Sequence, residues 1–400
     1  MKVCCLTTSY PRCPGDFAGV FTFWLHRELV KRGVEVHVIA PGADGLKAEE
    51  IWEGVHIHRF RYFFPRSLQR VAYGAGVLAN LRKDPWAWIG LPTFLLSFFL
   101  TTLRIGRKCD LLHCFWSPTA VIALPLGKLA GKGTVLTVLG SDIRYLPAFL
   151  NRLIFALVDR IIAPATEIFE ELEKLGVTNY RVIPMPVDES RFHPGQDFSS
   201  VRKDFGVRDE WVVTFVARLD EFKDPLTFVR AIPEIRRRIQ DVKFFLVGDG
   251  PLRGAVEELV ARDGLQDMVH LTGLRADVER FLGISHVFVA LSPYENTWSS
   301  TIAEAMFMEV PCIITDAGYS ARFFTHRENC LLISPREPKA LADAVVELLA
   351  DEKLRAHIVN GAKDLLRHRH RTIPEITKAT MDLYRDLVPQ ASLKNGTVYS

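Results

Sequence analysis

The chain has 400 residues, more than a single hydrophobic core usually serves, so we expect two domains. Hydrophobic residues make up 48% and charged residues 24%, as in ordinary globular proteins, and the formal net charge of +3 is too small to favour a nucleic-acid-binding protein. The seven cysteines are odd in number and form no C-x-x-C pair, which excludes a disulfide framework and favours reduced thiols in the cytoplasm.

Apolar strands and helical patterns alternate from the N-terminus. A strand is expected at 3–7, followed by a glycine-containing loop, a helix-periodic segment at 21–32 and a second strand at 34–40. This strand–helix–strand order predicts a parallel sheet. The pattern continues with strands expected at 111–114, 134–139, 159–163 and 181–183.

A cluster of prolines then separates two such series. Pro184, Pro186 and Pro194, with Gly195, are typical of a linker between domains. A second series of strands is expected at 211–216, 243–247, 269–271, 287–291 and 311–315. Helical patterns lie between these strands, near 225–239, 253–263, 276–282 and 302–309.

The predicted fold class is therefore α/β, with two Rossmann-like domains whose parallel sheets face an interdomain cleft. The N-terminal domain is expected over 1–187 and the C-terminal domain over 188–372. A helix at 373–388 is expected to pack back on the N-terminal domain, and 389–400 to form a loose tail. Ligands of open α/β sheets bind beyond the carboxyl ends of the strands, so the chemistry is expected on loops that follow strands.

Two neighbouring segments raise the question of a membrane. The run at 86–103 has no charges and is barely long enough to span a bilayer, but it contains Pro92, and we expect a buried helix. Six basic residues lie between 59 and 83 with aromatic residues among them and no acidic residue. Such a segment suits peripheral contact with an anionic bilayer, at the inner face of the cell membrane; the alternative is a solvated segment with a buried aromatic face.

The loop after the strand at 211–216 carries the strongest chemical signal. Arg218 leaves the strand end, and Lys223 stands just before a helix that Pro225 can begin. An Arg that gives planar bidentate contacts and a Lys that gives a point charge suit a diphosphate. Charged surface loops are common, so the alternative interpretation of this segment is a solvated loop without a ligand.

A second polar loop precedes the helical pattern near 302–309. Ser299, Ser300 and Thr301 are small, and the amides of a helix N-terminus favour anions. Glu304 lies one turn into that helix, where a carboxylate can bond ribose hydroxyls. The alternative is a serine cap followed by an ordinary glutamate. Two weaker signals are the turn at 248–251 and the loop at 15–19, whose glycines permit close approach of a ligand.

Together and in this order, these segments resemble glycosyltransferase family 4, the retaining glycosyl transferases of group 1 with the GT-B fold. "RVIPMPVDESRFHP" resembles the interdomain segment of that family, and "VARLDEFKDPLTFVRAI" its Arg/Lys diphosphate motif. "FLVGDGPLR" and "VHLTGLRADVERFLGISHVFVALSPYE" resemble its nucleotide-side strands, and "EAMFMEVPCIITDAG" follows its paired-glutamate motif. The resemblance covers nearly the whole chain.

The resemblance implies a site that binds a nucleotide-diphosphate sugar, UDP- or GDP-linked, without a cofactor or metal. It implies catalytic roles for Arg218 and Lys223, which would hold the diphosphate, and for Glu295. Asp142 would lie on the acceptor side. The remaining implied donor contacts are Gly19, Gly248, Leu274, Asn296, Ser299, Ser300, Thr301 and Glu304.

The chain departs from the family pattern in three places. The family separates its two glutamates by seven residues, whereas eight residues separate Glu295 from Glu304, so Asn296 stands at the expected position. Either Glu295 or Asn296 fills the first-glutamate role. The "HGSD" segment of many relatives begins here with Leu139, and Met185-Pro186 replaces the usual Asn-Gly of the interdomain segment.

The resemblance implies transfer of the sugar, with retention of anomeric configuration, to a hydroxyl of an acceptor such as a lipid-linked or cell-surface glycan. Fixed cations and amides would stabilise the charge on the departing diphosphate. Two alternatives remain open: another GT-B nucleotide-sugar enzyme, such as an epimerase or phosphorylase, and a catalytically silent scaffold that binds a nucleotide sugar.

Overall fold

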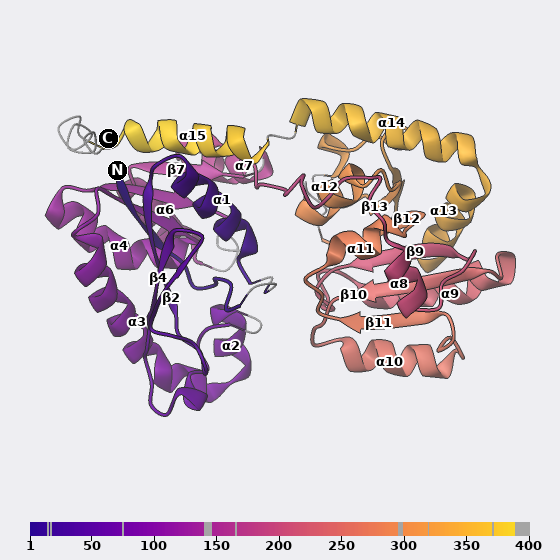
Figure 1. The fold of residues 1–400 in the computed structure, drawn as a ribbon, viewed down its shortest axis with the longest axis horizontal. Coiled ribbons are helices and arrows are strands. Elements are labelled where there is room, and N and C mark those ends of the chain that lie inside the picture. Colours follow the sequence, from indigo (N-terminus) through magenta and orange to yellow (C-terminus); the bar gives the residue numbers. More distant parts are fainter. Residues whose placement is uncertain are drawn as a thin grey trace. The chain divides into compact units, whose positions relative to one another are not determined.

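The structure is a computed structural model that describes residues 1–13, 16, 18–73, 76–139, 146–164, 166–294, 299–318, 320–369 and 372–388. The chain divides into two compact units (Figure 1). Unit 1 consists of Met1–Pro186 and the C-terminal segment that begins at 371, and unit 2 of Val187–His370.

Unit 1 is built on an eight-stranded sheet of order β3-β4-β2-β1-β5-β6-β7-β8. All neighbouring strands run parallel except β3, which pairs antiparallel with β4 at the edge. The strands are β1 (Lys2–Leu6), β2 (Glu35–Pro41), β3 (Glu49–Trp52), β4 (Val55–Phe60), β5 (Leu111–Phe115), β6 (Gly133–Thr137), β7 (Arg160–Ala163) and β8 (Tyr180–Val182).

Helices cover both faces of this sheet because successive strand side chains point to opposite sides. The helices are α1 (Val20–Lys31), η1 (Arg66–Leu68), α2 (Val77–Lys83), α3 (Pro85–Gly106), α4 (Ser117–Ala130), α6 (Ala148–Leu157), α7 (Thr166–Lys174) and α15 (Ile373–Arg385). Val3 and Cys5 join one core with α1 and α15, whereas Cys4 and Leu6 join the other with α3, α4, α6 and α7. Figure 1 shows α15 lying along α1.

The helix expected at 373–388 is α15, which belongs to the core of unit 1. Its Tyr384 is fully buried, and the Tyr384 hydroxyl lies 2.6 Å from Nδ1 of His113 in β5. Thr372 and Glu375 begin the helix with reciprocal side-chain-to-backbone bonds, the two halves of a capping box. The C-terminal segment therefore returns to the sheet with which the chain begins.

The expectation of a buried helix at 86–103 is wrong. Helix α3 packs Phe94 and Phe98 against the sheet, but Trp86, Leu96 and Leu100 on its other side are more than half exposed. Apolar residues therefore occupy both sides of the helix, and a pattern that is apolar all round does not distinguish a helix buried on every side from one buried on a single side. By length and composition α3 is the one helix in the described ranges that could cross a membrane.

Unit 2 contains a six-stranded parallel sheet of order β11-β10-β9-β12-β13-β14. The strands are β9 (Trp211–Val216), β10 (Val242–Val247), β11 (Val269–Gly273), β12 (Val287–Ala290), β13 (Cys312–Thr315) and β14 (Leu331–Ile333). The helices are α8 (Ser199–Asp204), α9 (Pro225–Arg238), α10 (Arg253–Arg262), α11 (Val278–Gly283), α12 (Ser300–Phe307), η2 (Ser320–Arg322), α13 (Pro338–Ala350) and α14 (Glu352–Arg369).

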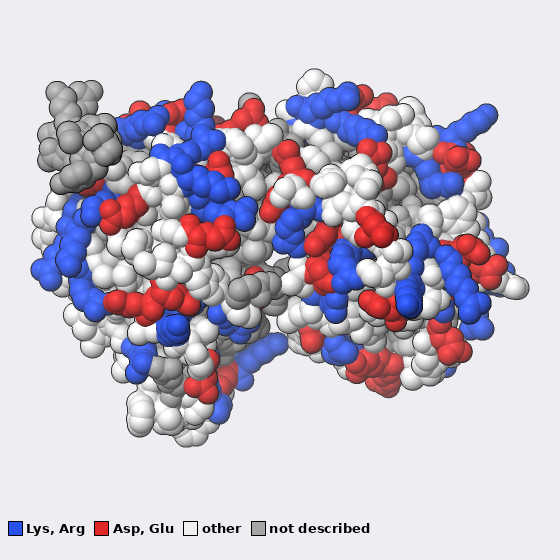
Figure 2. Space-filling view, in the orientation of Figure 1, with Lys and Arg blue, Asp and Glu red and all other residues white. Residues whose placement is uncertain are grey.

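Two helical layers enclose this second sheet. Helices α9, α10 and α13 share one core, α8, α11 and α12 share the other, and α14 contributes to both. On the face of unit 2 drawn in Figure 2, basic and acidic side chains are interspersed, without a broad area of one sign. The order of the strands, rather than the charge of this face, therefore indicates where a ligand would bind.

Candidate donor site in unit 2

The sheet of unit 2 reverses its winding between β9 and β12. From β9 the chain moves outward through β10 and β11, then returns to place β12, β13 and β14 on the other side of β9. Loops that leave the carboxyl ends of β9 and β12 therefore diverge, and open α/β sheets bind ligands at such a point. The predicted residues Arg218 and Lys223 follow β9, and Ser299 to Thr301 follow β12.

Asp220 organises the loop after β9. Its carboxylate is buried and pairs with Nε of Arg218, while Oδ1 accepts hydrogen bonds from the backbone N–H groups of Phe222 and Lys223, both at 3.1 Å. The Arg218 side chain is 53% exposed, so about half of it is open to solvent beside the bond to Asp220. Sequence reasoning missed Asp220, although an aspartate whose carboxylate accepts backbone amides two and three residues ahead is a common turn former.

Lys223 is a half-buried cation beside this turn. Among the described residues, the structure shows no hydrogen bond or ion pair for its ammonium group. Burial lowers the pKa of Lys223, the nearby Asp220 raises it, and Arg218 lowers it further. A bound anion would stabilise the charged form of the Lys223 ammonium group, which burial disfavours.

Two glycines after β10 hold the β9 loop in place. A Cβ atom on Gly248, at φ +146°, would lie 1.9 Å from the carbonyl oxygen of Ala217, and one on Gly250 would lie 2.4 Å from that of Leu219. The Leu219 N–H donates to the Asp249 carbonyl at 3.0 Å. The predicted residue Gly248 thus allows two backbone segments to meet at the carboxyl edge of the sheet.

The neighbouring β11 loop also reaches this edge. The Gly248 N–H donates to the Gly273 carbonyl at 2.8 Å, which places the predicted residue Leu274 directly after this bridge. The Leu274 side chain is 53% exposed. An exposed apolar side chain at this edge of the sheet is suited to cover the flat face of an aromatic ring.

Helix α12 presents its N-terminus beyond β12. Ser299 is its N-cap and accepts a hydrogen bond from the Ile302 N–H at 3.4 Å, and the hydroxyls of Ser299 and Thr301 are 3.2 Å apart. Ser300 is exposed, and the first turn contains no acidic residue. This end of α12 therefore offers backbone amides, hydroxyls and a positive dipole end to an anion.

Glu304 is a buried carboxyl one turn into α12. It is 7% exposed, and no hydrogen bond to its side chain is present within the described part of the chain. Burial raises its pKa to about 7, with a lowering contribution from Arg191 and a raising one from Glu279. Such a group can accept hydrogen bonds from sugar hydroxyls once it ionises.

Arg191 and Glu279 are further residues that the sequence analysis missed. One guanidinium nitrogen, Nη2 of Arg191, lies 2.6 Å from both Glu279 Oε2 and the Ala276 carbonyl oxygen. Arg191 lies within the interdomain segment quoted above, but only the fold shows that it and Glu279 act electrostatically on Glu304. Nothing in the spacing of these three residues predicts that proximity.

The structure does not bring four other predicted residues into this description of unit 2. Gly19 belongs to unit 1, where it precedes α1 at φ +67° and a Cβ would lie 2.4 Å from the Ser9 carbonyl oxygen. Asp142, Glu295 and Asn296 lie outside the described residues. Over the described ranges there is no group of three or more His, Cys, Asp or Glu side chains arranged to hold a metal ion.

Comparisons with known proteins agree with this architecture. Residues 18–191 match the family model "Glycosyltransferase Family 4", and 210–351 match "Glycosyl transferases group 1". The chain is 24% identical to N-acetyl-alpha-D-glucosaminyl L-malate synthase of Bacillus anthracis, over 100% of both chains. It is 29% identical to the GDP-mannose-dependent alpha-(1-6)-phosphatidylinositol monomannoside mannosyltransferase of Mycobacterium tuberculosis, over 42% of this chain and 46% of that protein.

A solved structure gives the same result for the fold. Anabaena HepE in complex with UDP and glucose superposes with a TM-score of 0.76 at 17% identity, over 97% of this chain and 100% of that one. The predicted GT-B fold is confirmed, as is the predicted enzyme class. The chain belongs to the family 4, group 1 glycosyltransferases.

Proposed function

We propose that the enzyme transfers a sugar from a UDP- or GDP-sugar to a hydroxyl of a lipid-linked or cell-surface glycan, with retention of anomeric configuration. The observation that carries this proposal is the pair Arg218 and Lys223 after β9, together with the N-terminus of α12 after the adjacent strand β12. HepE binds UDP and glucose, and the mycobacterial relative depends on GDP-mannose, so relatives support either nucleotide.

The diphosphate is the leaving group in this reaction. As the glycosidic bond breaks, negative charge grows on the phosphate oxygen that departs from the sugar. The Lys223 ammonium group forms no ion pair among the described residues, and the Arg218 side chain is 53% exposed beside its bond to Asp220. Cations fixed in place before the reaction stabilise that charge without reorganisation, which is typically the largest single contribution to catalysis.

The ribose is assigned to Glu304. Its carboxyl is buried beside Arg191 and Glu279, and burial raises its pKa to about 7. Two adjacent ribose hydroxyls would supply the hydrogen bonds that the carboxylate lacks in the described part of the protein, and they would favour its ionised form. Leu274, exposed after β11, would then lie on the side of the base, and the hydroxyls of Ser299 and Thr301 on the side of the phosphate or sugar.

The acceptor hydroxyl would attack the face of the sugar from which the diphosphate departs, which retains the anomeric configuration. A phosphate oxygen of the donor would accept the acceptor proton, so no side-chain nucleophile is required. We assign the first-glutamate role to Glu295 or Asn296 and an acceptor contact to Asp142. The enzyme would meet its acceptor in the cytoplasm, at the inner face of the cell membrane, where a lipid-linked glycan is accessible.

A donor screen tests the proposal. Purified protein is titrated with UDP, GDP, ADP, CMP and their sugars, and unfolding temperature is followed. A ligand at about 100 times its dissociation constant adds roughly 2.7 kcal/mol of stability. Stabilisation by one nucleoside diphosphate, lost in Lys223→Met, supports the donor site. Stabilisation without transfer to any glycan acceptor would favour a silent scaffold, and phosphate-dependent release of sugar phosphate would favour a phosphorylase.

A further inference from the structure

Helix α3 has two apolar sides, and only one of them is used by the fold. Phe94 and Phe98 pack into the core of unit 1. On the opposite side, Ile89, Leu96 and Leu100 are 57%, 57% and 53% exposed. Positions 89, 96 and 100 fall on one stripe of an α-helix, so these side chains form a continuous apolar strip along α3.

The helices next to α3 in this layer, α4 and α6, also expose large apolar side chains. Helix α4 contacts both α3 and α6, so the three helices form one layer over the sheet. Leu129 of α4 is 89% exposed, and Phe149 of α6 is 73% exposed. We call the following residues the apolar face: Ile89, Leu96, Leu100, Leu129, Phe149 and Leu153. Large contiguous apolar surfaces on a soluble domain mark sites of association.

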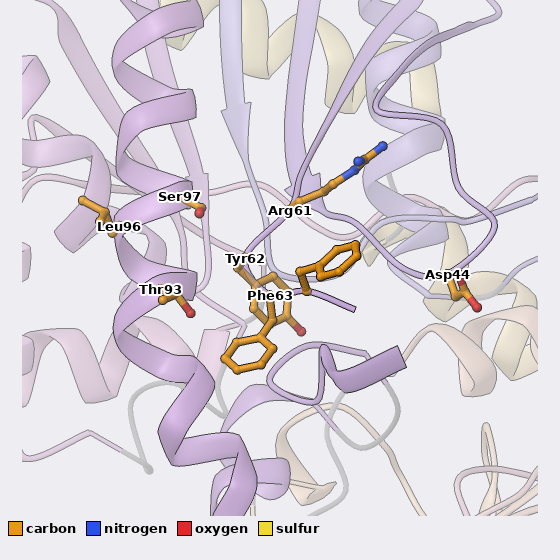
Figure 3. A pocket seen from close by; sticks show the side chains of 8 residues that line it. Asp44, Arg61, Tyr62, Phe63, Thr93, Leu96 and Ser97 are labelled. Carbon is orange, nitrogen blue, oxygen red and sulfur yellow. The ribbon is translucent and has the colours of Figure 1, made fainter. Parts of the chain in front are cut away.

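A pocket of about 540 Å³ opens on the same layer (Figure 3). Leu96 and Thr93 of α3 line it, together with Tyr62 and Phe63 from the segment after β4. The Tyr62 hydroxyl is held by the backbone N–H groups of Val71 and Ala72 at 3.1 and 3.3 Å, so that wall is fixed. Leu96 belongs to both the pocket and the apolar face, which gives this face room for a hydrocarbon chain.

The same part of the chain is strongly basic. Residues 61–158 contain twelve Lys and Arg residues but only three Asp and no Glu, whereas the whole chain carries a net charge of only +3. Lys83 and Arg107 are exposed at the two ends of α3, and neither has an ion pair among the described residues. One acidic residue, Asp44, lines the pocket, and Asp84 is paired with Arg70 at 3.1 Å.

Helix α3 cannot cross a membrane while unit 1 keeps this fold. A Cβ on Gly106 would lie 2.9 Å from Leu126 and 3.0 Å from Leu112, so the helix end is pressed against α4 and the sheet. Phe94 and Phe98 would have to leave the core for the helix to insert. An interfacial helix instead lies in the plane of the bilayer with one apolar side in the lipid.

We propose that the apolar face of unit 1 docks on an anionic bilayer surface, with α3 in the plane of the membrane and Lys83 and Arg107 on lipid headgroups. The docking itself is argued from α3 and its neighbours. Only its biological role, to hold the enzyme near a lipid-linked acceptor, rests on the proposed function. A second copy of the chain fits less well, because a two-fold interface through this face would bring the same cations together.

Vesicle sedimentation tests the proposal on the full chain. We expect binding to phosphatidylcholine vesicles that contain phosphatidylglycerol, and binding at least about tenfold weaker without the anionic lipid or at high salt. Lys83→Glu/Arg107→Glu should weaken binding at least about tenfold. The matched control, Lys31→Glu/Lys378→Glu on α1 and α15, makes the same change of charge on the other side of the sheet and should bind as the parent protein does.

A second pair of variants tests the apolar part. Leu96→Asp/Leu100→Asp should abolish binding to anionic vesicles, and Leu96→Met/Leu100→Met should retain it. Circular dichroism and a urea unfolding transition like that of the parent protein show that the Asp variant is folded. Nucleoside-diphosphate binding is measured separately on the parent protein, so a protein that binds vesicles but no nucleotide contradicts only the proposed function.

Two results would overturn the docking proposal. One is equal sedimentation of the parent protein with and without anionic vesicles. The other is a stable dimer in light scattering that Leu96→Asp/Leu100→Asp dissolves while vesicle binding is absent, which would assign the face to a second copy.

Discussion

Gly248 lies so close to Ala217 that any side chain at position 248 would collide with the backbone. A Cβ there would be 1.9 Å from the Ala217 carbonyl oxygen. This contact joins the loop after β10 to the loop that carries Arg218 and Lys223. The geometry of the diphosphate cations thus depends on a residue that itself offers no side-chain chemistry.

Gly248→Ala should therefore destabilise unit 2 by on the order of 2 kcal/mol and weaken nucleotide binding, because the backbone must move and φ of +146° is strained for alanine. Urea unfolding and nucleotide titration measure both effects. Gly254→Ala is the control, since nothing lies within 4 Å of its Cβ and it is in α10. It should be neutral or stabilise the protein by about 0.5 kcal/mol. Equal effects of the two variants would contradict the role assigned to Gly248.

Replacing Lys223 should separate stability from catalysis. Burial lowers the pKa of Lys223, so its charged form costs folding free energy at neutral pH. Lys223→Met should raise the unfolding temperature slightly and lower turnover on the order of 100-fold, because the leaving group loses a cation. Lys203→Met, at an exposed position of α8, should change neither. A Lys223→Met enzyme with unchanged turnover would remove Lys223 from the site.

Glu304 should make stability depend on pH near neutrality. Its pKa is raised from 4.5 to about 7 in the folded protein, so the folded state holds a proton that the unfolded state has released. Stability should therefore fall as pH rises from about 4.5 to 7, by on the order of 3 kcal/mol, and then level off. Urea unfolding of the parent protein and Glu304→Gln across this range measures the effect, since the variant lacks the ionisable group.

Nucleotide binding offers an independent check on Glu304. If ribose hydroxyls favour the ionised carboxylate, binding near pH 6 should release a proton. Calorimetric titrations in buffers of different ionisation enthalpy detect that proton, and Glu304→Gln should release none from this position. Proton uptake by the parent protein would oppose the ribose assignment.

Arg59 should be the most sensitive charged residue of unit 1. Its side chain is 1% exposed and donates to Glu50 at 2.8 Å, the Pro11 carbonyl at 2.6 Å and the Tyr73 hydroxyl at 3.1 Å. Arg59→Met leaves Glu50 partly buried without its cation and should cost about 3 kcal/mol. Arg104→Met breaks a pair with Glu49 in which both side chains are 60% exposed, and should cost at most about 0.5 kcal/mol. Denaturant titration distinguishes the two.

The sequence predicted the fold class and most strands because apolar runs and turn residues are local signals. The strand at 211–216 was predicted with the bounds of β9, and the helix at 21–32 is displaced from α1 by one residue at each end. The β3–β4 hairpin was missed, because its strands carry Glu49, Glu50 and histidines where an apolar pattern was sought. Of the two strands only β3 is at the edge of the sheet, where a strand buries less surface and needs fewer apolar residues.

The site was less accessible from sequence. Residue types and order placed Arg218, Lys223, Ser299 and Glu304 on loops or a helix end at the carboxyl edge, but their roles in donor binding stay predictions. The raised pKa of Glu304 and its neighbours Arg191 and Glu279 result from burial and tertiary packing, which no spacing encodes. The outer side of α3 was predicted to be buried, because the sequence shows that its residues are apolar but not whether other elements of the fold cover them.

The return of α15 to the first sheet has a consequence for synthesis of the chain. Tyr384 and Ile376 fill a core that also contains Val3, Leu29 and Phe115. A ribosome releases those N-terminal residues long before it has made α15, and all of unit 2 is translated in between. Until α15 has been made, one side of the sheet of unit 1 is therefore incompletely covered. All residues of unit 2 are available for folding before then. The core of unit 1 can therefore be completed only after α15 has been made.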